Sequence, residues 1–114
     1  MAKYLSNAFS LSMLPLPSVL DPAADVRVRV KPITEAFARN IAGAYTSVVG
    51  HQDTASLFSS VLGIQVPMNR VTTKLSHGDC LLVGQYMGPR LPEGTTTLPE
   101  GASIQWMIVE ALGE

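Results

Sequence analysis

The sequence predicts an α+β fold in which a mixed β-sheet of about five strands packs against two main helices. Stretches rich in β-branched and apolar residues alternate with two stretches of helical periodicity, and glycine and proline separate them. The 114 residues suit one domain spanning 1–114. A chain of this length can bury roughly two-thirds of its unfolded surface, which is enough for a hydrophobic core.

The first two strands are expected in the N-terminal third of the chain. Residues 3–9 have the pattern of a short strand, and residues 14–25 are rich in proline, which lacks the N–H that helices and sheets need. In DVRVRVKPI, residues 25–33, valines alternate strictly with basic residues. This alternation predicts a strand with a buried valine face and a solvated basic face.

Two helices are expected in the middle of the chain. The first covers residues 33–43, with Thr34 as N-cap and Gly43 as the stop. Its large apolar residues lie four apart, at Ile33, Phe37 and Ile41. The second helix is expected from His51 to Leu62 and ends at Gly63, with its apolar face formed by Thr54, Leu57, Phe58, Val61 and Leu62.

The remaining strands are short or lie in the C-terminal half. Residues 44–50 are β-like, and residues 70–75 and 80–87 are expected to form a hairpin through the turn sequence SHGD. A glycine- and proline-rich loop follows, beginning with GPRLPEG at residues 88–94. Residues 103–112 form the closing strand.

The amino-acid composition limits the classes of partner that the protein is expected to bind. Charged residues supply 15% of the chain, against about 25% in a typical soluble domain, so part of the surface is expected to meet a partner, most simply in a homodimer. The net charge of −1 argues against broad binding to duplex DNA, which needs a basic face. A small anionic ligand held by a few arginines stays compatible with this charge.

The cysteine count and the lengths of the apolar runs predict the cellular location of the protein and the state of its thiol. The single cysteine, Cys80, forms no intrachain disulfide and is expected to be a small buried strand residue. The apolar runs are far shorter than the ~18 residues of a membrane span, and the N-terminus lacks the pattern of a signal peptide. We therefore expect no membrane partner and a cytoplasmic location, in the host cytoplasm if the protein is viral.

Gly50 and His51 form the first candidate site. A strand that runs into a helix through glycine leaves the first helical amides unpaired, and these amides with the helix dipole favour a bound anion. A histidine there would lie beside a bound phosphate, whose charge favours the imidazolium while the helix start disfavours it. With ligand bound, His51 could donate a proton. The alternative is that His51 only caps the helix or packs.

Other polar residues are ambiguous when read singly. Arg70 and Arg90 could be solvated charges, although Arg90 lies in a rigid glycine-proline loop, and Ser10 could be an ordinary loop residue. The histidines and the cysteine are not spaced as metal ligands, and the phosphate-binding and dinucleotide-binding glycine motifs are absent from the sequence. We therefore expect neither a metal nor a cofactor.

Four stretches carry a resemblance to a known family. They are YLSNAFSLSML, VVGHQDTASLFSSVLGIQVPMNRV, KLSHGDCLLVGQYMGPRLPEG and IQWMIVEAL, in this order. Over most of its length the chain resembles the small viral and bacterial ring nucleases that act as anti-CRISPR proteins against type III systems. The most specific parts are the Gly-His before a helix, the Asn-Arg-Val after a proline and the Arg-Leu-x-Glu-Gly loop.

The resemblance implies a function and a set of site residues. It implies cleavage of cyclic tetra-adenylate, the second messenger of type III CRISPR complexes, by a dimer whose cleft takes the ring. It implies that His51 is the general acid and that Arg90 lies beside the scissile phosphate, with Glu93 as a candidate base or as a group that orients Arg90. The expected ligand-binding residues are Ser10, Asn7, Arg70, Gln85 and Gly50. The sequence departs from the family at residues 95–103, which are too short and too rich in glycine and proline for the helix usually found there.

RNA supplies its own nucleophile for such a reaction, since a ribose 2′-hydroxyl can attack the adjacent phosphorus. The products would be linear di-adenylates that end in a 2′,3′-cyclic phosphate, and no metal is required. Two other classes stay open. The protein could bind and sequester a cyclic oligonucleotide without cutting it, or it could be a structural protein that uses its apolar surface alone.

Overall fold

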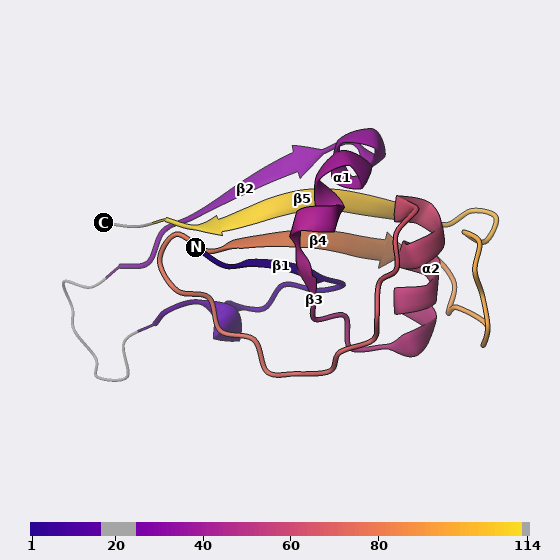
Figure 1. Ribbon diagram of the computed structural model, residues 1–114, viewed down its shortest axis with the longest axis horizontal. Helices are drawn as coiled ribbons and strands as arrows, with labels where there is room; N and C mark the ends of the chain where they lie inside the picture. The colour runs from indigo at the N-terminus through magenta and orange to yellow at the C-terminus, as the bar shows by residue number, and fades with distance from the viewer. Residues whose placement is uncertain (17–24, 113–114) are drawn as a thin grey trace.

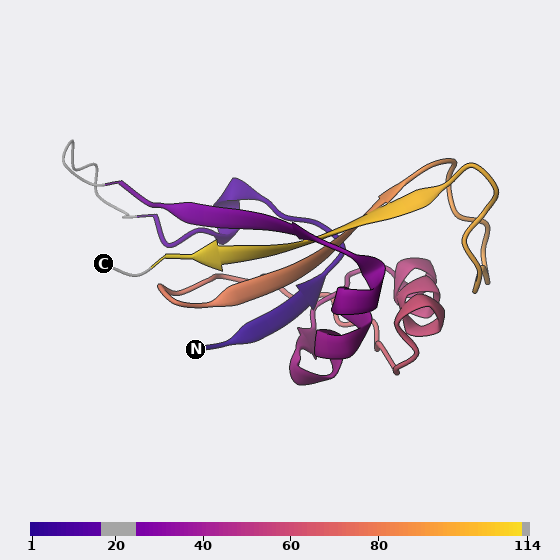
Figure 2. The ribbon, with the colours of Figure 1, turned by 90° about the horizontal axis from the view of Figure 1, so that it is seen from above.

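The computed structural model describes residues 1–16 and 25–112, which form a five-stranded mixed sheet with two α-helices on one of its faces (Figures 1 and 2). The strands are β1 (Lys3–Ser6), β2 (Val28–Ile33), β3 (Thr46–Ser47), β4 (Cys80–Met87) and β5 (Ser103–Ala111). The helices are α1 (Glu35–Ile41) and α2 (Gln52–Leu62), and two short 3₁₀ helices, η1 (Leu11–Met13) and η2 (Ala42–Ala44), lie in connections. The predicted α+β class is confirmed. Most of the predicted proline-rich loop, residues 17–24, lies outside the described residues.

The strand order is β2-β5-β4-β1-β3. β1 is parallel to both of its neighbours, with Leu5 opposite Ser47 of β3 and opposite Leu82 of β4. β5 is antiparallel to both β4 and β2. Because β1, β3 and β4 run in the same direction, their carboxyl ends meet at one end of the sheet, beside α2 (Figure 1).

Helix α1 begins as predicted but buries different residues. The Thr34 hydroxyl accepts the Phe37 amide at 3.1 Å, which confirms the N-cap. The predicted apolar stripe is wrong at Phe37, which is 45% exposed, while Ile33 and Ile41 are partly buried and pack against the main core. The fully buried residues beside them are Ala38 and Ala42. The small alanines let the helix backbone approach the sheet closely. Gly43 does not stop the helix, because the chain continues into η2.

Helix α2 agrees with the sequence analysis at both ends. His51 is the residue before the helix, and Gly63 ends it in the left-handed conformation with φ of 70°. Its buried residues are Ala55, Leu57, Phe58 and Leu62. Among the described residues, no helix combines the length and apolar character that crossing a membrane requires.

The predicted hairpin between residues 70–75 and β4 is wrong. Both edges of β4 are already paired, one with β1 and the other with β5. Residues 70–75 instead form no strand, and the segment ends with Leu75 against the face of the sheet that the helices leave free. There the Leu75 amide donates to the Met13 carbonyl at 2.7 Å, and the Leu75 side chain packs with Leu81 and Val83 in a second apolar cluster.

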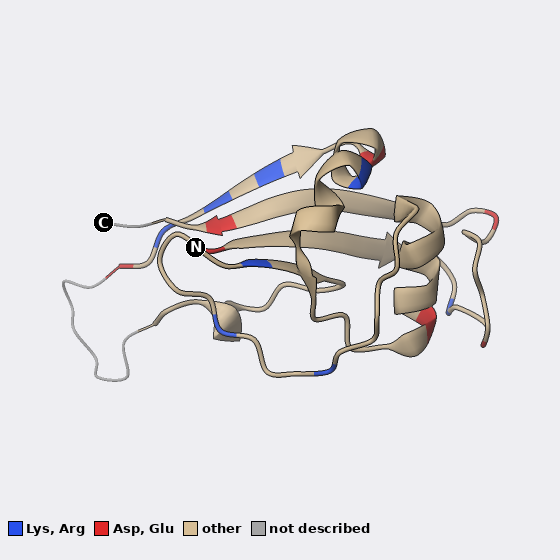
Figure 3. Cartoon of the chain, viewed as in Figure 1, with Lys and Arg blue, Asp and Glu red and all other residues tan. Residues whose placement is uncertain are grey.

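The strand predicted at residues 25–33 is present as β2, but the prediction that its valine face is buried is wrong. Val26 precedes β2, and Val28 and Val30 are 36% and 51% exposed. β2 is an edge strand that pairs only with β5, and neither helix lies over its length (Figure 2). Basic positions mark β2, while charges are sparse on the central strands (Figure 3).

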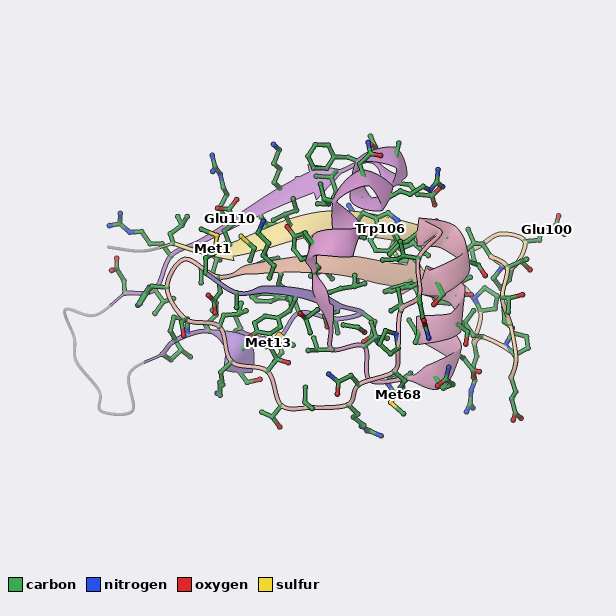
Figure 4. All side chains as sticks on the ribbon, in the orientation of Figure 1. Met1, Met13, Met68, Glu100, Trp106 and Glu110 are labelled. Carbon is green, nitrogen blue, oxygen red and sulfur yellow. The ribbon has the colours of Figure 1, made fainter. Side chains whose placement is uncertain are left out.

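The main core is built around Trp106 of β5, which lies beneath the helices (Figure 4). Its ring centroid is 5.0 Å from that of Phe58 on α2, in a tilted arrangement. The two rings fill the space above Gly84 of β4. A Cβ at Gly84 would lie 2.5 Å from Trp106 Cζ3 and 2.7 Å from Phe58 Cζ, so only glycine fits beneath this aromatic pair.

We therefore expect Gly84→Ala to destabilise the protein. The added methyl group forces the rings of Trp106 and Phe58 apart, and overpacking of this kind typically costs about 1–3 kcal/mol. Urea denaturation followed by Trp106 fluorescence measures the change. Gly43→Ala is the matched control, because a Cβ there meets nothing within 4 Å. A Gly84→Ala protein as stable as the Gly43→Ala protein would contradict this account of the core.

Candidate functional site

Most of the site residues predicted from the sequence follow the carboxyl ends of the parallel strands. Asn7 comes directly after β1, Gly50 and His51 come after β3, and Arg90 and Glu93 lie in the loop after β4. In open α/β sheets, ligands bind in the crevice outside these strand ends. The parallel pairing of β1 with β3 and β4 therefore gathers three segments that are far apart in the sequence.

His51 lies at the N-cap position of α2 but does not act as a side-chain cap. Its backbone is extended, with φ of −132° and ψ of 132°, and its imidazole makes no capping hydrogen bond. The side chain is exposed. The first amides of the helix have no acceptor within the helix itself. An exposed imidazole and backbone donors thus lie at the same helix end, and the capping interpretation of His51 does not apply to its side chain.

Asn7 and Arg70 both contact Gly50. The Gly50 amide donates to Asn7 Oδ1 at 3.4 Å. A Cβ at Gly50 would lie 3.6 Å from Arg70 Cγ, so the aliphatic part of Arg70 packs against this glycine. Three of the predicted ligand-binding residues therefore lie together beside the start of α2.

Asn69 holds the segment that carries Arg70, a role that the sequence analysis missed. Its amide donates to the Val49 carbonyl at 2.8 Å, and its side-chain Nδ2 donates to the Ser47 carbonyl at 2.9 Å. Ser47 Oγ donates in turn to the Pro67 carbonyl at 2.7 Å. The chain around Met68 thus lies along β3 (Figure 4). The Asn-Arg-Val motif includes Asn69, but its backbone partners lie about 20 residues earlier.

An open hollow of about 590 Å³ joins the start of α2 to the loop after β4. Its lining residues are Gln52 and Asp53 from the first turn of α2, and Arg90, Leu91, Pro92 and Glu93 from the loop. The structure thus brings Arg90 and Glu93 to the residues that directly follow His51. Gln52 and Asp53 were not predicted as site residues, since nothing in their local sequence separates them from an ordinary polar helix face.

A smaller hollow of about 260 Å³ lies on the face of the sheet opposite the helices. It is lined by Asn7, Ala8, Phe9, Val83, Gln85 and Met107. It brings together two predicted ligand-binding residues, Asn7 and Gln85, and Asn7 also contacts Gly50. Ser10 lines neither hollow. Its hydroxyl accepts the Ser12 amide at 3.2 Å and caps η1, so its role in the structure is local.

The comparison with known families agrees with this arrangement of elements. The sequence model of the STIV B116-like family matches residues 3–105. The chain belongs to the STIV B116-like family. The structure of B116 of Sulfolobus turreted icosahedral virus superposes with a TM-score of 0.71 at 25% sequence identity, covering 96% of this chain and 99% of B116.

A second viral relative is "Uncharacterized protein 26" of Sulfolobus islandicus filamentous virus (isolate Iceland/Hveragerdi). It is 31% identical to this B116-like chain over 77 residues, which cover 66% of this chain and 64% of the relative. The chain therefore matches just under two-thirds of that protein's length. Both relatives are viral proteins, which places this chain in a family of small proteins found in viruses.

Within residues 1–16 and 25–112 of this B116-like protein, no three His, Cys, Asp or Glu side chains cluster as ligands of a metal ion would.

Two side chains among the described residues have clearly shifted pKa values, and both lie at the amino ends of the parallel strands. Burial raises the pKa of the Cys80 thiol, and the Glu110 carboxylate opposite it on β5 raises it further. Burial also raises the pKa of Tyr45. Cys80 is thus half-buried and lies away from the site.

We expect the Cys80 thiol to react slowly with iodoacetamide. Only the thiolate is alkylated, and a raised pKa means that less thiolate is present at any pH near 8. The rate should increase at a higher pH in the folded protein than in the same protein unfolded in urea. Mass spectrometry of the alkylated fraction between pH 7 and 10 measures both profiles. Coincident profiles would contradict the assigned environment of Cys80.

Proposed function

We propose that this protein is a metal-independent ring nuclease that cleaves cyclic tetra-adenylate and thereby switches off type III CRISPR signalling. The observation that carries the proposal is the convergence at the carboxyl ends of β1, β3 and β4. An exposed histidine without a capping bond lies there between one arginine packed on Gly50 and a hollow lined by another. The choice of cyclic tetra-adenylate as the substrate rests on the resemblance of the sequence to ring nucleases.

The reaction uses the ligand's own nucleophile. The 2′-oxygen of one ribose forms a bond to the adjacent phosphorus and gives its proton to solvent. The bond between that phosphorus and the 5′-oxygen breaks, and the His51 imidazolium donates a proton to the leaving oxygen. Cutting a ring of four nucleotides at two opposite phosphates yields two di-adenylates, each with a 5′-hydroxyl and a 2′,3′-cyclic phosphate. A positioned acid of this kind typically contributes about 10²–10⁴-fold in rate.

The other residues bind and align the phosphate. The planar guanidinium of Arg90 suits two phosphate oxygens at once, and Glu93 of the same loop lines the same hollow. Arg70 provides a second cation beside Gly50, where the absence of a side chain lets a phosphate approach the first amides of α2. Alignment of the 2′-oxygen with the scissile bond supplies much of the remaining acceleration, since effective alignment is worth about 7–11 kcal/mol in favourable intramolecular reactions.

The smaller hollow suits an adenine base. Asparagine and glutamine amides match the donor and acceptor edge of adenine, and Asn7 and Gln85 both line this hollow. Phe9 offers a ring on which a base can stack. Because Asn7 also accepts the Gly50 amide, it links the base-binding hollow to the phosphate-binding end of α2.

We propose further that the protein acts as a homodimer in the cytoplasm of the host. A ring with two equivalent cleavage sites matches a two-fold axis that supplies one His51 from each protomer. The face opposite the helices exposes Val28 and Val30, with the partly buried Met107 beside them on β5. The smaller hollow opens on the same face, so pairing of two copies through this face would place their base-binding hollows next to each other.

The central test of the function is incubation of the protein with cyclic tetra-adenylate in excess EDTA, with the products identified by mass spectrometry. We expect di-adenylate 2′,3′-cyclic phosphate as the product. His51→Ala should keep most of the affinity and lose about 10²–10⁴-fold in single-turnover rate, because it removes only the proton donor.

His77→Ala is the matched control, because His77 lies in the turn before β4 and its Nδ1 lies 2.9 Å from the Leu112 carbonyl, far from the start of α2. It should cleave at the parent rate. Tight binding without cleavage would instead identify a sequestering protein, and the absence of binding would exclude both proposals. Rescue of an EDTA-inhibited reaction by a divalent ion would contradict the metal-independent mechanism.

The dimer is tested by light scattering at micromolar concentration. We expect the parent protein to have twice the mass of the chain and Val30→Lys to be monomeric, because a charge on the open face of β2 opposes burial. Phe37→Lys is the control, since it places the same charge on an equally exposed apolar residue of α1, on the other side of the sheet. A monomeric parent, or equal masses for the two variants, would refute this interface.

A further inference from the structure

The loop between β4 and β5, residues 88–102, is held firmly at its base. A Cβ at Gly88 would lie 2.6 Å from that of Ala102, so the two ends of the loop are in close contact. Tyr86 Oη donates to the Pro89 carbonyl at 2.6 Å. Beyond this base, the loop runs past the end of the sheet, with Glu100 at its outer part (Figure 4).

Farther along, the loop makes one hydrogen bond to the rest of the described chain. The Gly94 amide donates to Asp53 Oδ1 at 3.3 Å, and Asp53 lies in the first turn of α2. The hydrogen bonds of the neighbouring Thr95 are internal to the loop, since its amide and hydroxyl both donate to the Pro92 carbonyl. Within residues 1–16 and 25–112, the placement of residues 90–98 by hydrogen bonding thus depends on Asp53.

We propose that Asp53 is a positioning residue, which holds the loop against α2 and so keeps Arg90 in reach of the phosphate that His51 serves. Asp53, Arg90 and Glu93 line the same hollow, and His51 lies two residues before Asp53. Gly94 follows Glu93 directly and adopts φ of 78°, a conformation that suits glycine. The bond from Gly94 to Asp53 therefore acts on the part of the loop that carries both charged residues. The role in ligand binding rests on the proposed function.

The acceptor oxygen of Asp53, and not its charge, gives it the positioning role. The hollow contains one cation, Arg90, and two carboxylates, Asp53 and Glu93. A carboxylate beside a phosphate site repels the ligand, so complementarity to the ligand does not account for an acid at this position. A carboxylate in the first turn of α2 interacts favourably with the helix dipole, and the same side chain accepts the Gly94 amide. An asparagine would provide the accepting oxygen without the charge.

Loss of this bond should weaken the site through the population of the competent loop. If Arg90 contacts the ligand only while the loop lies against α2, the apparent affinity falls in proportion to the time that the loop spends there. A loop held for about a tenth of the time binds about tenfold more weakly. The proposed catalytic group, His51 at the N-cap of α2, is unchanged by this loss.

The test compares Asp53→Ala, Asp53→Asn and Glu100→Ala. Glu100→Ala is the control, because it removes a carboxylate from the same loop at a residue with no hydrogen bond to α2 among the described residues. NMR measures hydrogen exchange at the Gly94 amide, and binding and single-turnover cleavage are measured with cyclic tetra-adenylate. We expect Asp53→Ala to speed exchange at Gly94 and to weaken binding and cleavage about tenfold. Asp53→Asn should keep slow exchange at Gly94 and bind the ring at least as tightly as the parent, because it keeps the acceptor oxygen and removes a charge that repels phosphate. Glu100→Ala should resemble the parent.

A double substitution separates positioning from a direct contact. If Asp53 acts through Arg90, then adding Asp53→Ala to Arg90→Ala should cause no further loss of affinity. Unchanged exchange in Asp53→Ala, equal losses in Asp53→Asn and Asp53→Ala, or independent losses in the double variant would each overturn the proposal. If the parent does not bind the ring, the proposed function fails, and exchange at Gly94 in the three variants still decides whether Asp53 holds the loop.

Discussion

The parallel pairing of β1 between β3 and β4 is the constraint on which the site depends. This pairing brings the carboxyl ends of three strands together at one end of the sheet, although Asn7 and Arg90 are far apart in the sequence. Without this pairing, Asn7 would not reach the Gly50 amide and the loop after β4 would not lie beside α2. The two short pairings of β1 therefore bring the site residues together, whereas the longer β4–β5 hairpin supplies the core residues Gly84 and Trp106 and the loop that carries Arg90.

The aromatic core fixes the height and angle of α2 above the sheet. Phe58 of α2 packs on Trp106 of β5, and both rings occupy the space left by Gly84. His51 stands two turns before Phe58 on the same element, so its position is set by this packing and not by a capping bond of its own. His51 is thus placed by a packed helix while its imidazole makes no capping hydrogen bond, which leaves the imidazole able to contact a ligand.

The two faces of the sheet have different roles in this account. The helix-covered face holds the main core and positions His51, whereas the opposite face carries a smaller cluster, a hollow lined by Asn7 and Gln85, and exposed valines on β2. A ring-shaped ligand that contacts both regions needs a site that passes around the end of β1. The low content of charged residues and the uncovered strand β2 fit the same proposal of a paired assembly.

The sequence by itself determined α2, β4 and β5, because strong local periodicity and the stop at Gly63 act within each element. It also pointed to Gly50, His51, Arg70 and Arg90 through their motifs. Only the tertiary structure decided that residues 70–75 form no strand, since both edges of β4 are taken by β1 and β5. The same holds for Asn69 with Ser47 and for Asp53 with Gly94, which bond across 22 and 41 residues. Contacts at such separations leave no periodic trace in the chain, because they depend on how whole elements pack.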